Sequence, residues 1–158
     1  MDLLDDEMLR LWKSLDQHNV RYIMVGGFAT NLHGFSRTTA DLDLWIDDTE
    51  ENRQKLIAAL SEMGLSNLES LIDTQLIPGW TTLKLASSFE LDIMTSLKGF
   101  ESGDFSDCFE VAATAEIQDI IVRFLHLNHL IKSKEASGRP KDQIDLLELK
   151  KIREQVNQ

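Results

Sequence analysis

The chain has 158 residues, of which 42% are hydrophobic, enough to bury the core of one compact domain. Its 16 Lys and Arg against 27 Asp and Glu give a net charge of −11, which disfavours binding to long duplex nucleic acid because that affinity comes largely from phosphate neutralisation. A single cysteine, Cys108, excludes an intramolecular disulfide and a Cys-rich zinc site. The sequence has no apolar run of roughly 18 residues, and its acidic N-terminus lacks the basic region of a secretory signal. We therefore expect a cytoplasmic protein without a membrane span.

The first half of the chain alternates between helical and extended patterns. Apolar residues at helical spacing predict an amphipathic helix, and two short apolar runs on either side of a glycine pair and a short helix predict two strands. These elements are expected over residues 3–18 (helix), 21–25 (strand), 28–33 (helix) and 42–46 (strand). Asp48 and Glu51 resemble a capping box for a further helix, which should run to about Met63 and end at Gly64.

The second half predicts a β-hairpin, two more strands and two C-terminal helices. The strands are expected over residues 80–86, 89–94, 109–113 and 120–125, and the helices over 128–137 and 141–155. Ser87-Ser88 would form the hairpin turn, Asn128 is the candidate N-cap, and the segment 138–140 separates the two helices. Four apolar residues of the last helix fall roughly on one stripe: Ile144, Leu147, Ile152 and Val156. Residues 67–79 show no clear pattern.

The order of these elements predicts one domain over residues 1–158. Its fold class is α+β, or α/β-like, with a small mixed β-sheet flanked by helices. The core of the domain is expected over about 20–125, and a C-terminal helical part over about 127–156.

Two acidic residues, Asp41 and Asp43, lie one residue apart in the second predicted strand region. In an extended strand, residues i and i+2 share a face, with Cα atoms about 6.5 Å apart. Carboxylates held that close repel each other unless a cation lies between them, and Mg²⁺ prefers oxygen ligands of this kind. Asp92, in the strand over 89–94, would join the pair if the two strands were neighbours. Three carboxylates can hold two metal ions about 3.5–4 Å apart, or one metal ion beside a base. The alternative is that the alternating acids only mark the solvated side of a strand.

The acids belong to a longer pattern of motifs. The motifs are Val25-Gly26-Gly27, then, after thirteen residues, Asp41-Leu42-Asp43-Leu44, and later Glu90-Leu91-Asp92-Ile93. This pattern resembles the nucleotidyltransferase superfamily of the DNA polymerase β type. The C-terminal run is Leu130-Ile131-Lys132-Ser133-Lys134-Glu135-Ala136-Ser137-Gly138-Arg139-Pro140-Lys141-Asp142, followed by Asp145-Leu146. That run is similar to the C-terminal signature of AbiEii-type toxin nucleotidyltransferases and their small relatives.

The resemblance implies a role for each matching residue. Gly26 and Gly27 would hold nucleotide phosphates through backbone N–H groups, as glycine turns that lead into helices do. The catalytic acids and metal ligands would be Asp41, Asp43 and Asp92. Asp92 would also accept the proton of the attacking nucleophile.

Basic residues near these motifs are candidate nucleotide ligands: Arg37, Lys134, Arg139 and Lys141. Arg37 lies just before the acids and could reach a triphosphate; the alternative is an ordinary surface arginine. The resemblance places Lys134 and Lys141 near the β- and γ-phosphates, with Asp142 and Asp145 orienting these cations. The alternative is a solvated junction between two helices that carries ordinary surface charge.

These residues together predict a Mg²⁺-dependent nucleotidyltransferase, with Mn²⁺ as a substitute ion. It would move an NMP from an NTP such as ATP to an unidentified acceptor, which could be a tRNA, a protein or a small molecule. The alternatives are a non-catalytic protein of the same fold, acting as a toxin–antitoxin partner or a nucleotide sensor, and a phosphohydrolase that uses water as the acceptor.

Four further side chains have structural and functional interpretations. Trp45 and Trp80 could stack on a base, although packing in the core or at its rim is the simpler interpretation. His33, which precedes Gly34, is more typical of a helix end than of a ligand. Lys84 would reach the site only in one register of the hairpin.

Overall fold

The computed structural model describes residues 2–68, 80–87, 89–101 and 103–157 of the chain. Residues 69–79 and Ser88 lie outside these ranges. The segment 67–79, which showed no clear pattern, is therefore described only at residues 67–68, and the predicted hairpin turn only at Ser87. The helices are α1 Asp6–Gln17, α2 Gly26–Leu32, α3 Glu50–Glu62, α5 Phe105–Glu110, α6 Leu127–Ser137 and α7 Pro140–Val156. The strands are β1 Tyr22–Val25, β2 Asp41–Ile46, β3 Trp80–Lys84, β4 Glu90–Met94, β5 Ala113–Ile117 and β6 Ile120–Phe124.

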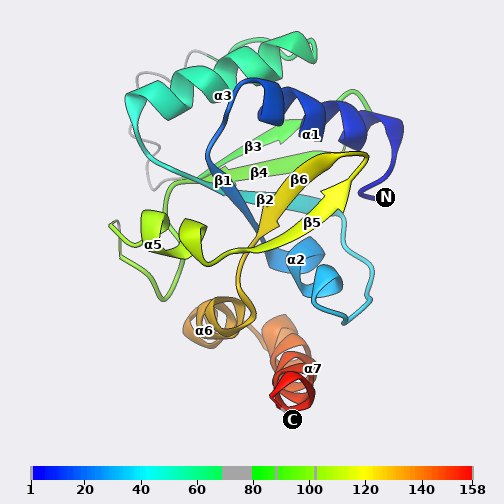
Figure 1. Ribbon diagram of the computed structural model, residues 1–158, viewed down its shortest axis with the longest axis vertical. Helices are drawn as coiled ribbons and strands as arrows, with labels where there is room; N and C mark the ends of the chain where they lie inside the picture. The colour runs from blue at the N-terminus through cyan, green and yellow to red at the C-terminus, as the bar shows by residue number, and fades with distance from the viewer. Residues whose placement is uncertain (1, 69–79, 88, 102, 158) are drawn as a thin grey trace.

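A six-stranded mixed sheet forms the centre of the molecule, with strand order β3-β4-β2-β1-β6-β5. Helices α1 and α3 lie on one side of this sheet, whereas α2, α6 and α7 lie on the other (Figure 1). The four residues of β1 are all buried, as expected for a strand near the middle of a sheet that helices cover on both faces. The predicted fold class, a mixed sheet flanked by helices, is confirmed. None of the helices within the described residues is long and apolar enough to cross a membrane.

Two pairings of β2 bring the polar motifs to one region. Strand β2 runs antiparallel to β1 and parallel to β4, and β4 runs antiparallel to β3. The Gly26-Gly27 turn follows β1 directly and opens α2, so it lies at the edge of the sheet where β2 begins. The condition under which Asp92 would join Asp41 and Asp43, that the strands over 89–94 and 42–46 are neighbours, is met.

The predicted strand over 109–113 is wrong, because this segment ends one helix and only begins the next strand. Helix α5 extends to Glu110 and buries Phe105 and Cys108, three residues apart, on one face. The Phe105 ring packs edge-on against Trp45 of β2, with ring centroids 5.2 Å apart. This tertiary contact anchors the helix that ends in the segment, although Phe109 and Val111 are residue types that also suit a strand.

Two predictions about helix caps are also corrected. Thr49, not Asp48, caps α3 by accepting a hydrogen bond from the Asn52 backbone N–H at 3.1 Å. His126, not Asn128, caps α6, since its ring Nδ1 accepts the backbone N–H of Asn128 at 3.1 Å.

Three of the four residues of the apolar stripe expected on the last helix face outward, whereas the fourth, Ile152, is half-buried. Ile144, Leu147 and Val156 are exposed, and α7 instead buries Leu146 and Leu149. Asp142 and Asp145 lie on the same buried face as these two leucines, as the spacing of three and four residues requires. Helix α7 therefore packs through a stripe that includes two carboxylates.

Candidate active site

A cavity of ≈ 680 Å³ opens between the sheet edge and the C-terminal helices. Its walls come from the end of β1 and the turn after it, the segment 37–43, strands β3 and β4, the loop 96–98, and helices α6 and α7. All nine residues that the sequence predicted for the site line this cavity: Gly26, Gly27, Arg37, Asp41, Asp43, Asp92, Lys134, Arg139 and Lys141. The structure thus brings together four segments that are far apart in the chain.

The register of β2 and β4 places two of the acids face to face. Asp43 lies directly opposite Asp92, while Asp41 lies opposite Glu90 at the start of both strands. Asp92 is buried, and Asp43 is only partly accessible. Burial, followed by the neighbouring negative charge of Asp92, raises the pKa of Asp43 to about 7. Without a cation, these two carboxylates cannot both ionise at low cost.

Glycine is required at both positions of the turn. Gly26 has φ +69, and a Cβ atom there would lie 2.0 Å from Asp43 Oδ2. A Cβ atom on Gly27 would lie 2.5 Å from Thr39 Oγ1 and 3.2 Å from Arg37 Nη2. The two missing side chains therefore let an acid and the segment before β2 approach the backbone that opens α2.

A buried carboxylate, Asp145, connects two of the cations at the cavity. Its Oδ2 accepts a hydrogen bond from Arg37 Nη2 at 2.9 Å, and Arg37 Nε lies 2.8 Å from Oδ1. The same Oδ2 accepts a hydrogen bond from Lys134 Nζ at 2.8 Å. Lys134 is itself buried, with 5% of its surface exposed. Its ammonium group is largely occupied by protein carboxylates, which the sequence alone did not show.

A second buried carboxylate, Asp142, holds the turn between α6 and α7. It accepts hydrogen bonds from Arg139 Nε at 2.8 Å and from the Ser137 hydroxyl, and Lys134 Nζ lies 3.4 Å away. Burial opposes its ionisation, but these donors outweigh that effect and hold the pKa of Asp142 below its ordinary value. The predicted orienting contacts of Asp142 and Asp145 are present for Lys134, and similar contacts hold the two arginines.

Lys141 differs from the other predicted cations. It is exposed, lines the cavity and makes no ion pair within the part of the chain that the structure describes. Lys98 has the same properties in the loop that follows β4. Lys98 was not among the predicted site residues, although its position just beyond a strand that carries a predicted acid was a usable signal.

Thr82 was also missed. Its hydroxyl donates a hydrogen bond to Asp92 Oδ1 at 2.6 Å, because the register of β3 and β4 places the two residues directly opposite each other. The hairpin itself was predicted, but its register was not. Threonine is common in strands, so the sequence alone does not single out Thr82.

The remaining candidates separate into core and rim. Trp45 is buried, so its packing interpretation holds, whereas Trp80 is 53% exposed and lines the cavity. His33 Nε2 lies 2.7 Å from the carbonyl oxygen of Leu125, which accounts for it structurally. Lys84 is exposed and is not part of the cavity wall.

The donor set fits a divalent cation that arrives together with a nucleotide. Across residues 2–68, 80–87, 89–101 and 103–157, no three His, Cys, Asp or Glu side chains form a ready-made metal site. Mg²⁺ commonly binds through one or two carboxylates, with waters and substrate phosphates completing its shell. Asp43 and Asp92 provide such a pair, and burial together with the negative charge of Asp92 raises the pKa of Asp43, a cost that a bound cation would relieve. Metal binding by the three acids stays a prediction.

A mixed sheet with a glycine turn and facing acids at one edge is the architecture of nucleotidyltransferases. The chain belongs to the family described as nucleotidyltransferase of unknown function (DUF6036), whose model matches residues 1–157. No curated protein is similar enough to count as a match.

Several solved structures are similar in fold. The lincomycin-bound crystal structure of the lincosamide antibiotic adenylyltransferase LnuA has a TM-score of 0.62 and 18% identity, covering 94% of this chain and 97% of that one. TM1012 from Thermotoga maritima has a TM-score of 0.59 and 18% identity, covering 95% of this chain and 90% of that one. An antigenic nucleotidyltransferase-like protein from Paracoccidioides brasiliensis has a TM-score of 0.53 and 16% identity, covering 90% of this chain and 74% of that one. At these identities the likeness establishes the shared fold.

Proposed function

We propose that the protein transfers an NMP from an NTP to the hydroxyl group of an acceptor, with Mg²⁺ as the natural metal ion. The observation that carries the proposal is the register of β2 and β4, in which Asp43 faces Asp92 beside the Gly26-Gly27 turn. Acids from two separate segments, a glycine turn and a set of cations then surround one cavity. Phosphoryl transfer needs mainly this combination of positioning and charge stabilisation.

The reaction balances with groups of the protein and the two substrates. The acceptor oxygen forms a bond to the α-phosphorus of the NTP, the bond from that phosphorus to the bridging oxygen of the β-phosphate breaks, and pyrophosphate leaves. The proton of the acceptor hydroxyl passes to Asp92, a carboxylate at the cavity wall. Bound between the acids, a divalent cation would supply neutralisation of the phosphate charge.

The cations of the cavity divide into two groups in this proposal. Lys141 and Lys98, which are exposed and lack ion pairs within the described residues, are available to meet phosphate oxygens directly. Arg37, Lys134 and Arg139 are anchored by buried carboxylates and supply a fixed positive wall with little freedom to reorient. Fixed charges cost little reorganisation when the substrate binds, which is the advantage of a preorganised site.

The acceptor is the open part of this function. The net charge of −11 disfavours binding of a large nucleic acid, although the cations at the cavity could bind the end of a nucleic acid strand. LnuA, which shares the fold over nearly its whole length, is an adenylyltransferase of a small-molecule antibiotic. We therefore place a small hydroxyl-bearing molecule first among the acceptors, ahead of a protein or a tRNA.

Labelled nucleotides test the proposal. Each of the four NTPs, radiolabelled at the α-phosphate, is incubated with the protein, Mg²⁺ and fractionated cell extract. Transfer predicts label in a metabolite or macromolecule, and this label should disappear with EDTA and with the Asp43→Asn variant. The Asp119→Asn variant, at the turn between β5 and β6, should behave as wild type. Free labelled NMP would indicate hydrolysis, and unaltered NTP would favour a sensing or toxin–antitoxin role over catalysis.

A further inference from the structure

The edge strand β3 contributes a polar contact to the acid pair. Thr82 Oγ1 donates a hydrogen bond to Asp92 Oδ1 at 2.6 Å. This length is typical of a hydroxyl that donates to an ionised carboxylate, a hydrogen bond stronger than one between neutral groups. Within the described residues, the other side chain in hydrogen-bond contact with Asp92 is the facing acid, Asp43. Thr82 therefore controls one of the two oxygens of the third acid.

The sheet fixes this contact before any substrate binds. Strands β3 and β4 are antiparallel, and Thr82 and Asp92 are directly opposed in their register. Opposed residues have Cβ atoms about 4.5–5.5 Å apart, within reach of a hydroxyl and a carboxylate. A β-branched threonine also has restricted χ1 freedom, so its hydroxyl holds its direction at little entropic cost.

We propose that Thr82 is a positioning residue of the site, whose hydroxyl holds the Asp92 carboxylate in one orientation and leaves its second oxygen available to the metal ion or to the acceptor proton. This inference rests on the proposed function, since it assigns Thr82 a role through Asp92. Carboxylates that bind metals are commonly held by such outer hydrogen bonds, and losing one typically costs about 10–100-fold in metal affinity or activity.

The competing interpretation is that Thr82 is an ordinary exposed strand residue that happens to face an acid. Its neighbour Thr81 provides a control for that interpretation. Thr81 lies opposite Ile93, so its side chain is on the other face of the strand. Removing the hydroxyl group is the same chemical change at either threonine, and both lie in the same strand. Only Thr82, however, contacts Asp92.

Three variants test the proposal: Thr82→Val, Thr82→Ser and Thr81→Val. Valine keeps the shape and strand preference of threonine and removes the donor, whereas serine keeps the donor. The first measurement is Mn²⁺ affinity, read from the electron paramagnetic resonance signal of free Mn²⁺ with a non-hydrolysable NTP analogue present. The second is the apparent kcat and KM for NTP, measured as the rate of label transfer into the acceptor-containing extract fraction. Urea unfolding verifies that each variant is folded.

We expect Thr82→Val to lower Mn²⁺ affinity, kcat or both by about 10–100-fold, with KM for NTP nearly unchanged. Thr82→Ser should recover most of the loss, and Thr81→Val should match wild type. Wild-type Mn²⁺ affinity and kcat in Thr82→Val would overturn the proposal. A loss in Thr82→Ser as large as in Thr82→Val would also overturn it, because the methyl group and not the hydroxyl would then be responsible.

The outcome separates this inference from the proposed function. If wild type binds Mn²⁺ and transfers label while Thr82→Val does both equally well, only the role of Thr82 is lost. If wild type neither binds Mn²⁺ with the nucleotide analogue nor transfers label, the proposed function fails, and the positioning role fails with it.

Discussion

The Asp43→Asn variant should be inactive and yet more stable than wild type. Asp43 faces Asp92 across two paired strands, and burial and that neighbouring charge raise its pKa to about 7. Asparagine has nearly the same size and shape, so the change removes a charge without creating a cavity. Transfer should be lost because a proposed metal ligand is lost.

The gain in stability follows from the linkage between protonation and folding. In the unfolded chain the Asp43 carboxyl titrates at 3.8, whereas in the folded chain it titrates at about 7. The folded state therefore holds more protons between these values, and the free energy of unfolding falls as the pH rises through this window. A change in pKa from 3.8 to about 7 corresponds to about 4 kcal/mol. Wild type carries this whole cost above pH 7 and roughly a third of it at about pH 5.

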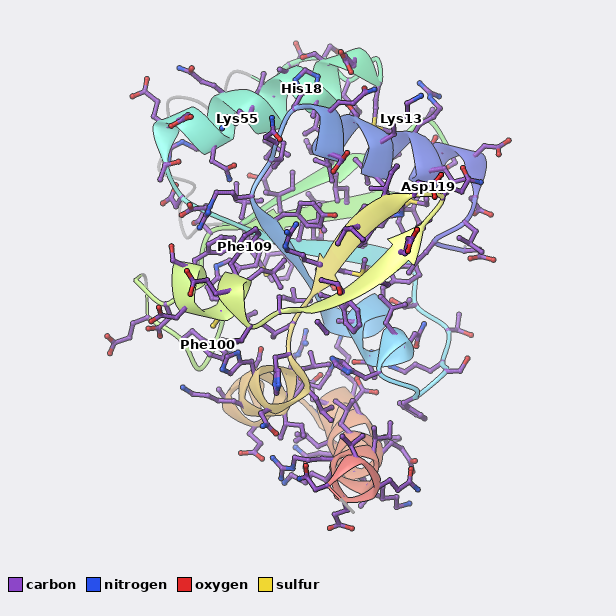
Figure 2. The ribbon with its side chains drawn as sticks, viewed as in Figure 1. Lys13, His18, Lys55, Phe100, Phe109 and Asp119 are labelled. Atoms are coloured by element: carbon purple, nitrogen blue, oxygen red, sulfur yellow. The ribbon has the colours of Figure 1, made fainter. Side chains whose placement is uncertain are left out.

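Urea unfolding in EDTA at about pH 5 and about pH 8 measures this cost directly. Asp43→Asn should exceed wild type in stability by up to about 4 kcal/mol at the higher pH, and this advantage should shrink by about 2–3 kcal/mol at the lower one. Asp119→Asn is the matched control, since Asp119 lies at the β5–β6 turn, close to α1 and away from α6 and α7 (Figure 2). An advantage that is equal at both pH values would refute the raised pKa. Wild-type turnover in Asp43→Asn would remove this residue from the site.

Two paired comparisons extend these predictions. Gly26→Ala should abolish transfer and destabilise the fold by more than about 2 kcal/mol, because its Cβ atom would lie 2.0 Å from Asp43 Oδ2 at a residue with φ +69. Gly64 has φ +84 but open space around it, so Gly64→Ala should lower the free energy of unfolding in urea by only about 1 kcal/mol. Equal losses in the two variants would argue against the close contact between residue 26 and Asp43. Lys134→Met should destabilise the fold by about 3–5 kcal/mol because it leaves buried carboxylates without a partner. A loss of stability within about 0.5 kcal/mol would show that these ion pairs do not stabilise the fold. Lys141→Ala should change stability by less than about 0.5 kcal/mol but weaken NTP binding in calorimetry, and an unchanged nucleotide affinity would assign Lys141 to the ordinary surface.

Much of the fold could be predicted because its signals are local. The alternation that puts Asp41 and Asp43 on one face is a property of any extended strand, and both residues line the cavity. The end of α3 at Gly64 and the turn at Gly138 follow from backbone preferences of glycine, which has positive φ at both positions. The hydrophobic runs likewise predicted β1, β2 and β6 to within about two residues.

The predictions that were wrong depend on contacts between distant parts of the chain. Residues 109–113 include residue types that suit a strand, but helix α5, which packs its Phe105 on Trp45, extends to Glu110. Most of the stripe expected on α7 is exposed because the helix turns its Leu146 and Leu149 face inward. Periodicity identifies an amphipathic helix but cannot decide between two apolar stripes when both are present.

The sequence by itself determined which residues are candidates for the site: the glycine pair, the three acids and the basic C-terminal motif all line the same cavity. Only the tertiary structure decided what these groups contact. Arg37 meets Asp145, 108 residues away, Lys134 is buried between two carboxylates, and Thr82 binds the third acid. These contacts depend on strand register and on how α7 packs, which are set by the free energy of burying the whole core and not by any local pattern.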